Sequence, residues 1–553
     1  MKTTMDIQRR RLLKYAGITV AAAASYPSLL FATNAYIGNQ PSPDFEADVE
    51  IELKLEAISM PIFEGQRTRI WKVYGKVLKG DESVLENIPG TYLAPTIRLR
   101  KGQKVRIYLR NNLPVESILH WHGLHVPADM DGNPMYAIMH GGTYVYEFEI
   151  LNRAGTYWYH SHTHHVTGKQ VYLGLAGLFI VSDEEEASLG LPSGKYDIPV
   201  VIQDRSFDDQ NQLVYLTHMR QRMRGFLGEQ IFVNGEPDFE LPVETRAYRL
   251  RLLNGSSSRI YKLAWDDGSP FTVIGVDGGL LEHPEHYPYL MLAPGERREL
   301  WVDFSGRHVG TELTLRSIPF ASPNGGMMGM MGGHHRGMMG GGMMGGHHRR
   351  MMGGGMMGGH MMSGGELPLG GDYPLFKVKV VKQSQGRDIL PKRLSTIQPL
   401  RYQDAANADH PRRITLSMGP MAGLLNGRSY KMNDVRADEI IQVNTLQVIE
   451  FDNEFHSGQG SKHGMMAMPH PMHLHGEQFQ IVKRELSSRH HREDYETFSA
   501  GFVDSGWKDT VLVMPGEKVT VLKPFNHFKG LFMYHCHNLE HEDLGMMRDF
   551  LIK

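Results

Sequence analysis

The sequence predicts an all-β protein built from several sandwich or barrel domains. From about residue 46 onward, short runs alternate apolar and polar side chains and are separated by Gly, Pro and Asn, as in residues 105–110. Such runs with regular turn signals are typical of antiparallel sandwiches. Helical periodicity is scarce, and a length of 553 residues leaves room for three or four domains.

Two repeated segments support a multidomain β protein. Residues 293–304 and 514–525 share a Pro-Gly-Glu turn followed by an alternating strand, and residues 155–162 parallel residues 530–537 as an aromatic strand that ends in His-X-His. Repetition of this kind indicates copies of one structural unit. We therefore interpret the first and last thirds of the chain as copies of one domain.

The N-terminus resembles a bacterial export signal of the twin-arginine type. Residues 8–14 read Gln-Arg-Arg-Arg-Leu-Leu-Lys and precede the apolar residues 15–24. This stretch is too short to cross a bilayer comfortably. We expect residues 1–35 to be removed, the protein to reach the periplasm or the extracellular space, and no stable membrane insertion. A short amphipathic basic helix is the alternative interpretation.

Composition excludes some classes of partner. The formal net charge is −2 and there is a single cysteine. A nearly neutral chain gives no reason to expect a nucleic-acid partner, and one cysteine cannot form an intramolecular disulfide. We expect a monomer.

The segment 325–365 differs from the rest of the chain. It consists almost wholly of Gly, Met and His with three arginines, and it contains no carboxylate. Such a composition cannot bury a core. Thioethers are soft ligands that favour cuprous ion, so labile Cu(I) sites are expected there. The arginines count against cation binding, and a neutral linker is the alternative.

The only cysteine, Cys536, lies between His535 and His537. Thiolate, imidazole and thioether form the ligand set of a blue-copper site, and Cys536, His541 and Met546 supply three of its four ligands. On a strand, Cys536 would face one way and the two flanking histidines, roughly 7 Å apart, the other. One strand could then contact two metal sites. The alternative is a buried thiol beside incidental histidines.

Histidines are paired in four runs that fall in the first and last thirds of the chain. On a strand, the two imidazoles of a His-X-His pair project to one face. No such pair occurs in residues 200–320, so an interface between the first and last domains could gather all eight imidazoles. The pairs are His120 and His122, His160 and His162, His473 and His475, and His535 and His537.

These motifs resemble those of the multicopper oxidases, of the laccase and bacterial cuprous oxidase type. The resemblance covers essentially the whole mature chain. It implies three consecutive cupredoxin-like Greek-key β-sandwich domains, which we place at residues 45–185, 195–385 and 395–553, with the Met-rich segment as an insert in the second.

The resemblance also implies four copper ions and their ligands. No ligand position of the family pattern is missing. The implied type 1 ligands are His470, Cys536, His541 and Met546; the type 2 ligands are His120 and His473; the type 3 ligands are His122, His160, His162, His475, His535 and His537.

By the same resemblance, four one-electron oxidations of substrate are coupled to reduction of O2 to two waters. Asp131 and Glu542 match the acidic residues that relay protons in the family, a role that suits carboxylates near a metal site. Without the motif context they would be read as a turn aspartate and a surface glutamate.

The electron donor is predicted to be Cu(I), in periplasmic copper tolerance. Met466, Met468, Met418 and Met421 are the candidate ligands of this substrate. The sequence departs from the best-known cuprous oxidases in two ways: Met466 stands where they have an aspartate, and the Met-rich segment interrupts the second domain and not the third.

Two other functions remain open at this stage. One is a general laccase that oxidises phenols or other small organic donors, and the other is a non-catalytic copper-sequestering or structural periplasmic protein. The complete ligand set argues against the second.

Overall fold

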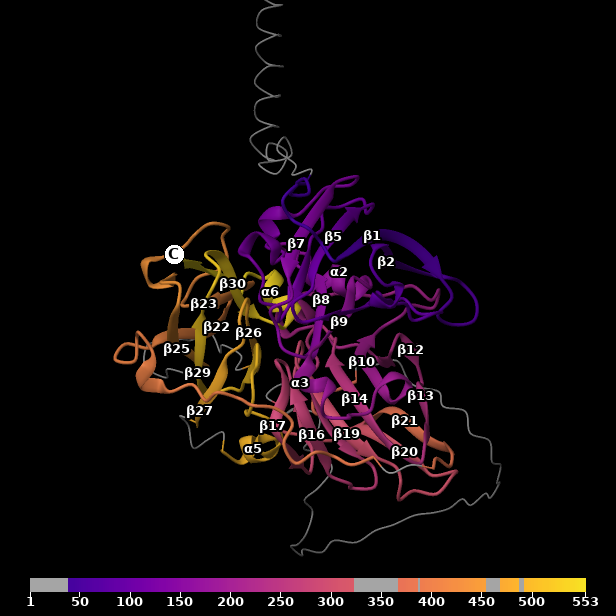
Figure 1. Cartoon of the computed structure of the whole chain (residues 1–553). Coiled ribbons are helices and arrows are strands. Elements are labelled where there is room, and N and C mark those ends of the chain that lie inside the picture. The colour runs from indigo at the N-terminus through magenta and orange to yellow at the C-terminus, as the bar shows by residue number, and fades with distance from the viewer. Residues whose placement is uncertain (1–37, 323–366, 386–387, 454–467, 487–491) are drawn as a thin grey trace, which may run out of the picture.

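The structure, a computed structural model, describes residues 38–322, 367–385, 388–453, 468–486 and 492–553. Within these ranges six sheets pair into three β-sandwiches that follow one another along the chain (Figure 1). The predicted all-β class with three consecutive sandwiches is confirmed. The predicted export signal, the Met-rich insert 325–365 and Met466 lie outside the described residues.

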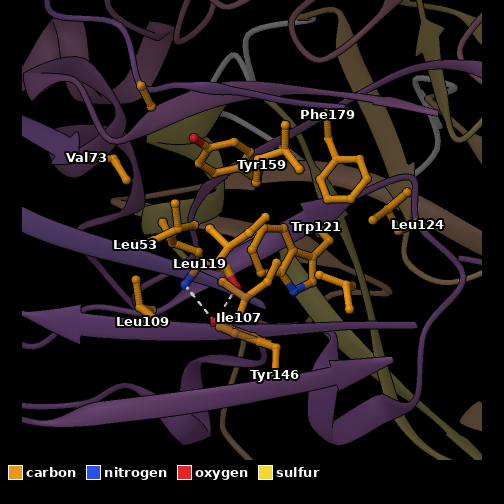
Figure 2. Close-up of a cluster of buried hydrophobic side chains, with 14 of the residues drawn as sticks. Leu53, Val73, Ile107, Leu109, Leu119, Trp121, Leu124, Tyr146, Tyr159 and Phe179 are labelled. Atoms are coloured by element: carbon orange, nitrogen blue, oxygen red, sulfur yellow. Dashed lines mark hydrogen bonds between the residues drawn. The ribbon is translucent and has the colours of Figure 1, made fainter. Parts of the chain in front are cut away.

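The first sandwich encloses an apolar core between its two sheets. Ile107 and Leu109 face Trp121 and Phe179 across this core, and Tyr146 donates a hydrogen bond to the carbonyl of Leu119 at 2.7 Å (Figure 2). One sheet has the order β2 (Thr68–Lys79), β1 (Val49–Met60), β5 (Lys104–Asn111), β7 (Thr143–Glu149); the other has β3 (Leu85–Glu86), β4 (Thr96–Arg100), β9 (Ala176–Ser182), β8 (Gly155–Ser161), β6 (Leu119–His122).

The second sandwich has its own core, to which strands of both its sheets contribute. Its larger sheet has the order β12 (Glu236–Pro237), β11 (Gln230–Val233), β10 (Asp197–Arg205), β14 (Ala247–Asn254), β19 (Arg297–Asp303), β16 (Phe271–Val276), β17 (Gly279–Tyr287). Its smaller sheet has the order β13 (Glu240–Glu244), β21 (Tyr373–Lys382), β20 (Glu312–Ser317), β15 (Tyr261–Trp265), β18 (Leu290–Leu292).

The third sandwich includes Cys536 and Met546 in its core. One sheet has the order β23 (Ala422–Leu425), β22 (Arg412–Gly419), β25 (Thr445–Asp452), β29 (Glu517–Phe525), β27 (Gln480–Leu486). The other has β24 (Ile440–Ile441), β31 (Met547–Ile552), β30 (Gly530–Cys536), β26 (His470–Leu474), β28 (Thr510–Val513).

The three sandwiches share one topology. Each has a parallel pair in one sheet between its first strand and a later one: β1 with β5, β10 with β14, and β22 with β25. Parallel neighbours cannot be joined by a tight hairpin, so the chain crosses to the second sheet between them. This crossing gives the Greek-key connection that the family resemblance implied.

Helices are short and lie outside the sheets. They are α2 (Thr167–Leu173), α3 (Glu184–Ala187), α4 (Met219–Arg224), α5 (Arg492–Glu496) and α6 (Leu539–Asp543), with 3₁₀ turns at Glu82–Val84, Ala128–Met130, Pro134–Tyr136, Gly194–Tyr196, Tyr402–Asp404, Ala437–Glu439 and Ser499–Gly501. In the part of the chain that is described, no helix is long and apolar enough to cross a membrane.

Helix α6 joins the third sandwich to the first. It lies beside β8 and α2 (Figure 1), and the backbone amides of Thr167 and Gly168 donate to the carboxylate of Asp543 at 2.9 and 3.0 Å. Because α6 follows directly after the Cys536 strand, this contact holds the end of β30 against the histidine-bearing strands of the first sandwich.

Candidate metal centre

Four strands carry the paired histidines, two in the first sandwich and two in the third. β6 pairs with β8 so that His120 lies opposite His160, and β26 pairs with β30 so that His473 lies opposite His535. The same pairing in two sandwiches turns their histidine edges toward each other. All eight imidazoles are almost completely buried, with exposures of 0–2%.

Ring nitrogens of the eight histidines face one another at short distances. Nδ1 of His122 is 3.4 Å from Nε2 of His160, and Nε2 of His535 is 3.3 Å from that of His162 and 3.1 Å from that of His475. The predicted type 2 pair is also brought together, with Nε2 of His473 3.4 Å from Nε2 of His120. The ring of His537 lies 4.9 Å from that of His122, between ring centres, so the structure gathers all eight paired histidines into one cluster.

The outward nitrogens of several of these rings are held by acceptors. Nδ1 of His120 lies 2.6 Å from the carbonyl of Asp131, Nδ1 of His473 lies 2.8 Å from the carbonyl of Asp509, and Nδ1 of His160 lies 2.9 Å from the carbonyl of Ser161. Such contacts fix the tautomer and direct the lone pair of Nε2 inward.

Burial keeps most of these imidazoles neutral. It lowers the pKa of His122, His160, His162, His473, His475 and His537 well below the ordinary value, and the neighbouring rings lower it further. The neutral ring is the form that binds a metal.

Several buried atoms in the cluster lack a hydrogen-bond partner among the described residues. They include both ring nitrogens of His537, both carboxylate oxygens of Glu542, Oδ1 of Asp131 and Nδ1 of His162. An unsatisfied buried polar group costs about 1–3 kcal/mol. Ring nitrogens that face one another, with the opposite nitrogen of each ring held by an acceptor, fit a group of metal ions at this position.

The two predicted acidic residues lie at the cluster. Oδ2 of Asp131 is 2.6 Å from Nδ1 of His475, and the carboxylate of Glu542 is 3.2 Å from Nδ1 of His535 and 3.7 Å from Nδ1 of His162. Both side chains are almost fully buried. Glu542 is therefore not a surface residue, and Asp131 does more than end a turn.

A second centre lies on the other face of β30. The sulfur of Cys536 is 3.5 Å from Nδ1 of His470 and 3.7 Å from Nδ1 of His541. Met546 is completely buried in the same apolar cluster, and its carbonyl accepts the amide of Cys536 at 3.0 Å. The alternation expected for a strand is thus observed, with Cys536 directed away from its two histidine neighbours.

The chemistry of this second donor set fits copper. Burial raises the pKa of the Cys536 thiol and lowers the pKa of His541 to about 4. A thiol in so apolar a place stays protonated unless a cation binds it. Two imidazoles, a thiolate and a nearby thioether are ligands of a blue-copper site.

The candidate substrate methionines are not equivalent. Met468 and Met418 are buried, with exposures of 2% and 6%, and both pack in the core of the third sandwich. Met421 is 54% exposed and has a positive φ of 60°.

Three residues at these centres were not predicted from the sequence. Nε2 of His541 contacts the carbonyl of Met223 on α4 at 3.2 Å, and the carboxylate of Asp509 contacts both His122 and Arg297. Met223 and Arg297 belong to the second sandwich, and residues 200–320 contain no His-X-His pair. Only the fold reveals that this sandwich reaches both centres.

Comparison with known proteins agrees with the fold and points to one protein family. Residues 72–186 and 399–553 match sequence profiles of the multicopper oxidase family. The crystal structure of the McoA multicopper oxidase from the hyperthermophile Aquifex aeolicus has a TM-score of 0.70 and 30% identity, and the match covers 92% of this chain and 97% of that one.

Two further relatives are named a laccase and a cell division protein. The laccase of Bacillus stratosphericus is 28% identical over 511 residues, which cover 83% of this chain and 89% of the laccase. The cell division protein FtsP of Escherichia coli is 33% identical over 318 residues, which cover 56% of this chain and 62% of FtsP.

Fold and site together define an oxidoreductase that depends on copper and uses O2 as its electron acceptor. The chain belongs to the multicopper oxidase family.

Proposed function

We propose that this oxidase takes its electrons from cuprous ion and serves copper tolerance in the periplasm. The observation that carries this proposal is the segment 325–365, with its paired methionines, its histidines and no carboxylate. Thioethers and imidazoles bind Cu(I) well, whereas they are poor ligands for hard cations. The balanced reaction is oxidation of four Cu(I) to Cu(II) with O2 and four protons giving two waters.

We assign four copper ions to the two centres. His470, Cys536, His541 and Met546 would hold the type 1 ion, His120 and His473 the type 2 ion, and the other six cluster histidines the type 3 pair. When bound, these ions supply one-electron redox chemistry at the first site and reduction of O2 at the second.

Cys536 connects the two centres through the chain itself. Its sulfur faces His470 and His541, while His535 and His537, its covalent neighbours, belong to the histidine cluster. Cys536 thus links, through its own backbone, the centre proposed to accept electrons from the donor to the centre proposed to reduce O2.

Asp131 and Glu542 are proposed to hold and deliver the protons that O2 reduction consumes. Each carboxylate has an oxygen without a hydrogen-bond partner among the described residues and lies beside cluster histidines. A carboxylate in this position can accept a proton at that oxygen and pass it inward.

A general laccase is the second candidate. The buried positions of Met468 and Met418 favour it, since neither thioether is free to bind a cation at the surface, and one relative is named a laccase. A non-catalytic copper-sequestering or structural role is disfavoured by the complete set of buried candidate ligands; one relative, FtsP, is named a cell division protein.

The first test is colour and copper content. The copper-loaded protein should be blue, and Cys536→Ser should abolish the blue absorption while leaving most of the copper bound. A colourless wild-type holoprotein would rule out the type 1 assignment.

The second test separates the donors. Turnover of Cu(I) and of a phenol is compared in the full-length protein, in a variant lacking residues 327–362, and in a full-length variant whose methionines in that segment are leucines. We expect both variants to lose Cu(I) turnover and to keep phenol turnover. If Cu(I) turnover is unchanged and phenol turnover rises on deletion, the segment is a lid and does not collect copper.

Periplasmic location is tested by cell fractionation. Replacement of Arg9, Arg10 and Arg11 by lysine should leave the protein in the cytoplasm if residues 1–35 are a twin-arginine signal. Unchanged export would contradict this assignment.

A further inference from the structure

His122 is held differently from the other cluster histidines. Its Nε2 lies 3.0 Å from Oδ1 of Asp509 and 3.1 Å from Oγ1 of Thr510, whereas its Nδ1 faces Nε2 of His160 at 3.4 Å. In His120, His160 and His473 it is Nδ1 that is held by an acceptor. The ring of His122 is thus reversed, and Asp509 is the group on its outer side.

Asp509 is itself held by Arg297, the first residue of β19 in the second sandwich. Nη1 of Arg297 donates to Oδ1 of Asp509 at 2.7 Å and Nη2 donates to Oδ2 at 2.5 Å, in a bidentate ion pair. Both side chains are completely buried. A bidentate pair of this kind is geometrically rigid.

The remaining donors of Arg297 are also used. Nε donates to the carbonyl of Thr156 in the first sandwich, Nη1 to that of Gly295 and Nη2 to that of Asp277, each at 2.9 Å. All five N–H groups of the guanidinium therefore have partners. Arg297 therefore contacts all three sandwiches and holds the carboxylate of Asp509 in one position.

The proton arrangement on His122 follows from this pair. A carboxylate bound by an arginine only accepts hydrogen bonds, so the ring nitrogen that faces Asp509 carries the proton. An imidazole that binds a metal is neutral and carries a single ring proton. The lone pair is then on Nδ1, which faces the cluster.

The space around this arrangement is closed. A Cβ on Gly123, whose φ is +87°, would lie 2.4 Å from Oδ2 of Asp509 and 2.9 Å from Nη2 of Arg297. A Cβ on Gly295 would lie 3.0 Å from His537 and 3.2 Å from His122. The Pro-Gly-Glu turn before β19 therefore packs directly against cluster rings.

We propose that Arg297 and Asp509 are positioning residues through which the second sandwich, which provides none of the assigned copper ligands, sets the ring orientation and tautomer of His122. This inference rests on the proposed assignment of His122 as a type 3 ligand. Loss of a group that orients a metal ligand typically costs 10–100-fold in metal affinity or activity.

Arg251 offers a matched control. It is a buried arginine of the same sandwich, binds Asp197 and Glu299, and also reaches Thr156, whose hydroxyl accepts its Nη1 at 3.1 Å. Within the described part of the chain, its hydrogen bonds go to Asp197, Glu299, Thr156 and Glu186 and to no cluster histidine. Arg251→Lys should therefore reproduce the loss of buried arginine ion pairs, and of a hydrogen bond to the first sandwich, without disturbing His122.

The experiment uses copper-loaded, full-length Arg297→Lys, Asp509→Asn and Arg251→Lys. Total copper, blue absorption, EPR-detectable copper and O2 consumption are measured for each, with the thermal midpoint as a check on folding. A magnetically coupled cupric pair gives no EPR signal, so the difference between total and EPR-detectable copper reports the type 3 pair.

We expect Arg297→Lys and Asp509→Asn to keep the blue absorption of the wild type, to lose the EPR-silent copper and to consume O2 about 10–100-fold more slowly. Arg251→Lys should keep the EPR-silent copper and O2 consumption even where its thermal midpoint falls. Asp509→Asn is nearly isosteric and decides the result if Arg297→Lys does not fold.

Preserved EPR-silent copper in Asp509→Asn, or an equal loss in Arg251→Lys, would overturn the positioning role. Failure of the positioning role can be distinguished from failure of the type 3 assignment, because the wild type is measured first. Absence of EPR-silent copper in a blue wild type would contradict the type 3 assignment itself, and the positioning role with it.

Discussion

Replacement of Glu299 by glutamine is expected to destabilise the protein strongly at neutral pH. Glu299 lies on β19 with no exposed surface. It accepts hydrogen bonds from the hydroxyl of Thr156 at 2.6 Å, from Nη1 of Arg251 at 2.9 Å and from Nε of Arg249 at 2.9 Å. The carboxylate thus ties the first sandwich to the second and compensates two buried guanidinium groups.

The pKa of Glu299 gives the size of its contribution to the free energy of unfolding and the direction in which that contribution changes with pH. Burial by itself would raise the pKa of Glu299, but Arg249 and Arg251 outweigh burial and lower it from 4.5 to about 2. This difference corresponds to about 3 kcal/mol. Because the folded pKa is the lower one, the contribution is complete above pH 4.5 and is lost as the pH falls from about 4.5 to about 2. Removing one partner from a buried ion pair costs a similar 3–5 kcal/mol or so.

The assay is urea unfolding of the full-length protein, followed by tryptophan fluorescence at pH 7 and at pH 3. We expect Glu299→Gln to unfold at clearly lower urea than the wild type at pH 7, and the difference to narrow at pH 3. Glu312→Gln is the control, since Glu312 forms an exposed pair with Lys379 at 3.1 Å and exposed pairs contribute little. Equal midpoints of wild type and Glu299→Gln at pH 7 would refute the reasoning.

Three further outcomes are expected. Trp121→Ala removes a fully buried side chain and should lower the free energy of unfolding by about 3–5 kcal/mol, measured by urea denaturation; a loss no larger than that caused by Trp507→Ala, at a half-buried side chain, would contradict this. Gly132→Ala should lower copper content, measured by atomic absorption, because a Cβ there would lie 2.2 Å from the carbonyl of Leu119 and 2.6 Å from Cα of His120. Burial raises the pKa of Asp549 to about 7, so its ionisation destabilises the fold as the pH rises from about 4 through 7. Asp549→Asn should therefore raise the thermal midpoint more at pH 8 than at pH 5.

Local patterns in the chain were enough to predict the histidine and cysteine constellation. A His-X-His pair on a strand projects to one face whatever surrounds it, because side chains alternate along a strand. His120, His160, His473 and His535 indeed lie opposite one another in two strand pairs. For the same reason Cys536 faces away from its neighbours. These properties depend on residues within a few positions of each other.

The contacts that orient the cluster histidines could not be predicted from local sequence patterns. Asp509 is 387 residues from His122 and 212 residues from Arg297, and no local pattern marks either residue. The contact between Met223 on α4 and His541 likewise forms only because the second sandwich packs against the third.

The sequence by itself determined that this is a β-sandwich copper oxidase and which residue types carry its chemistry, because strand alternation and ligand identity are local properties. The tertiary structure decided which atoms meet. It buried Met418 and Met468 in a core, reversed the ring of His122, and brought Arg297 of the second sandwich to the histidine cluster. Burial and long-range ion pairs arise only when distant segments pack, and here they bury the cluster histidines and place the Arg297–Asp509 pair against His122.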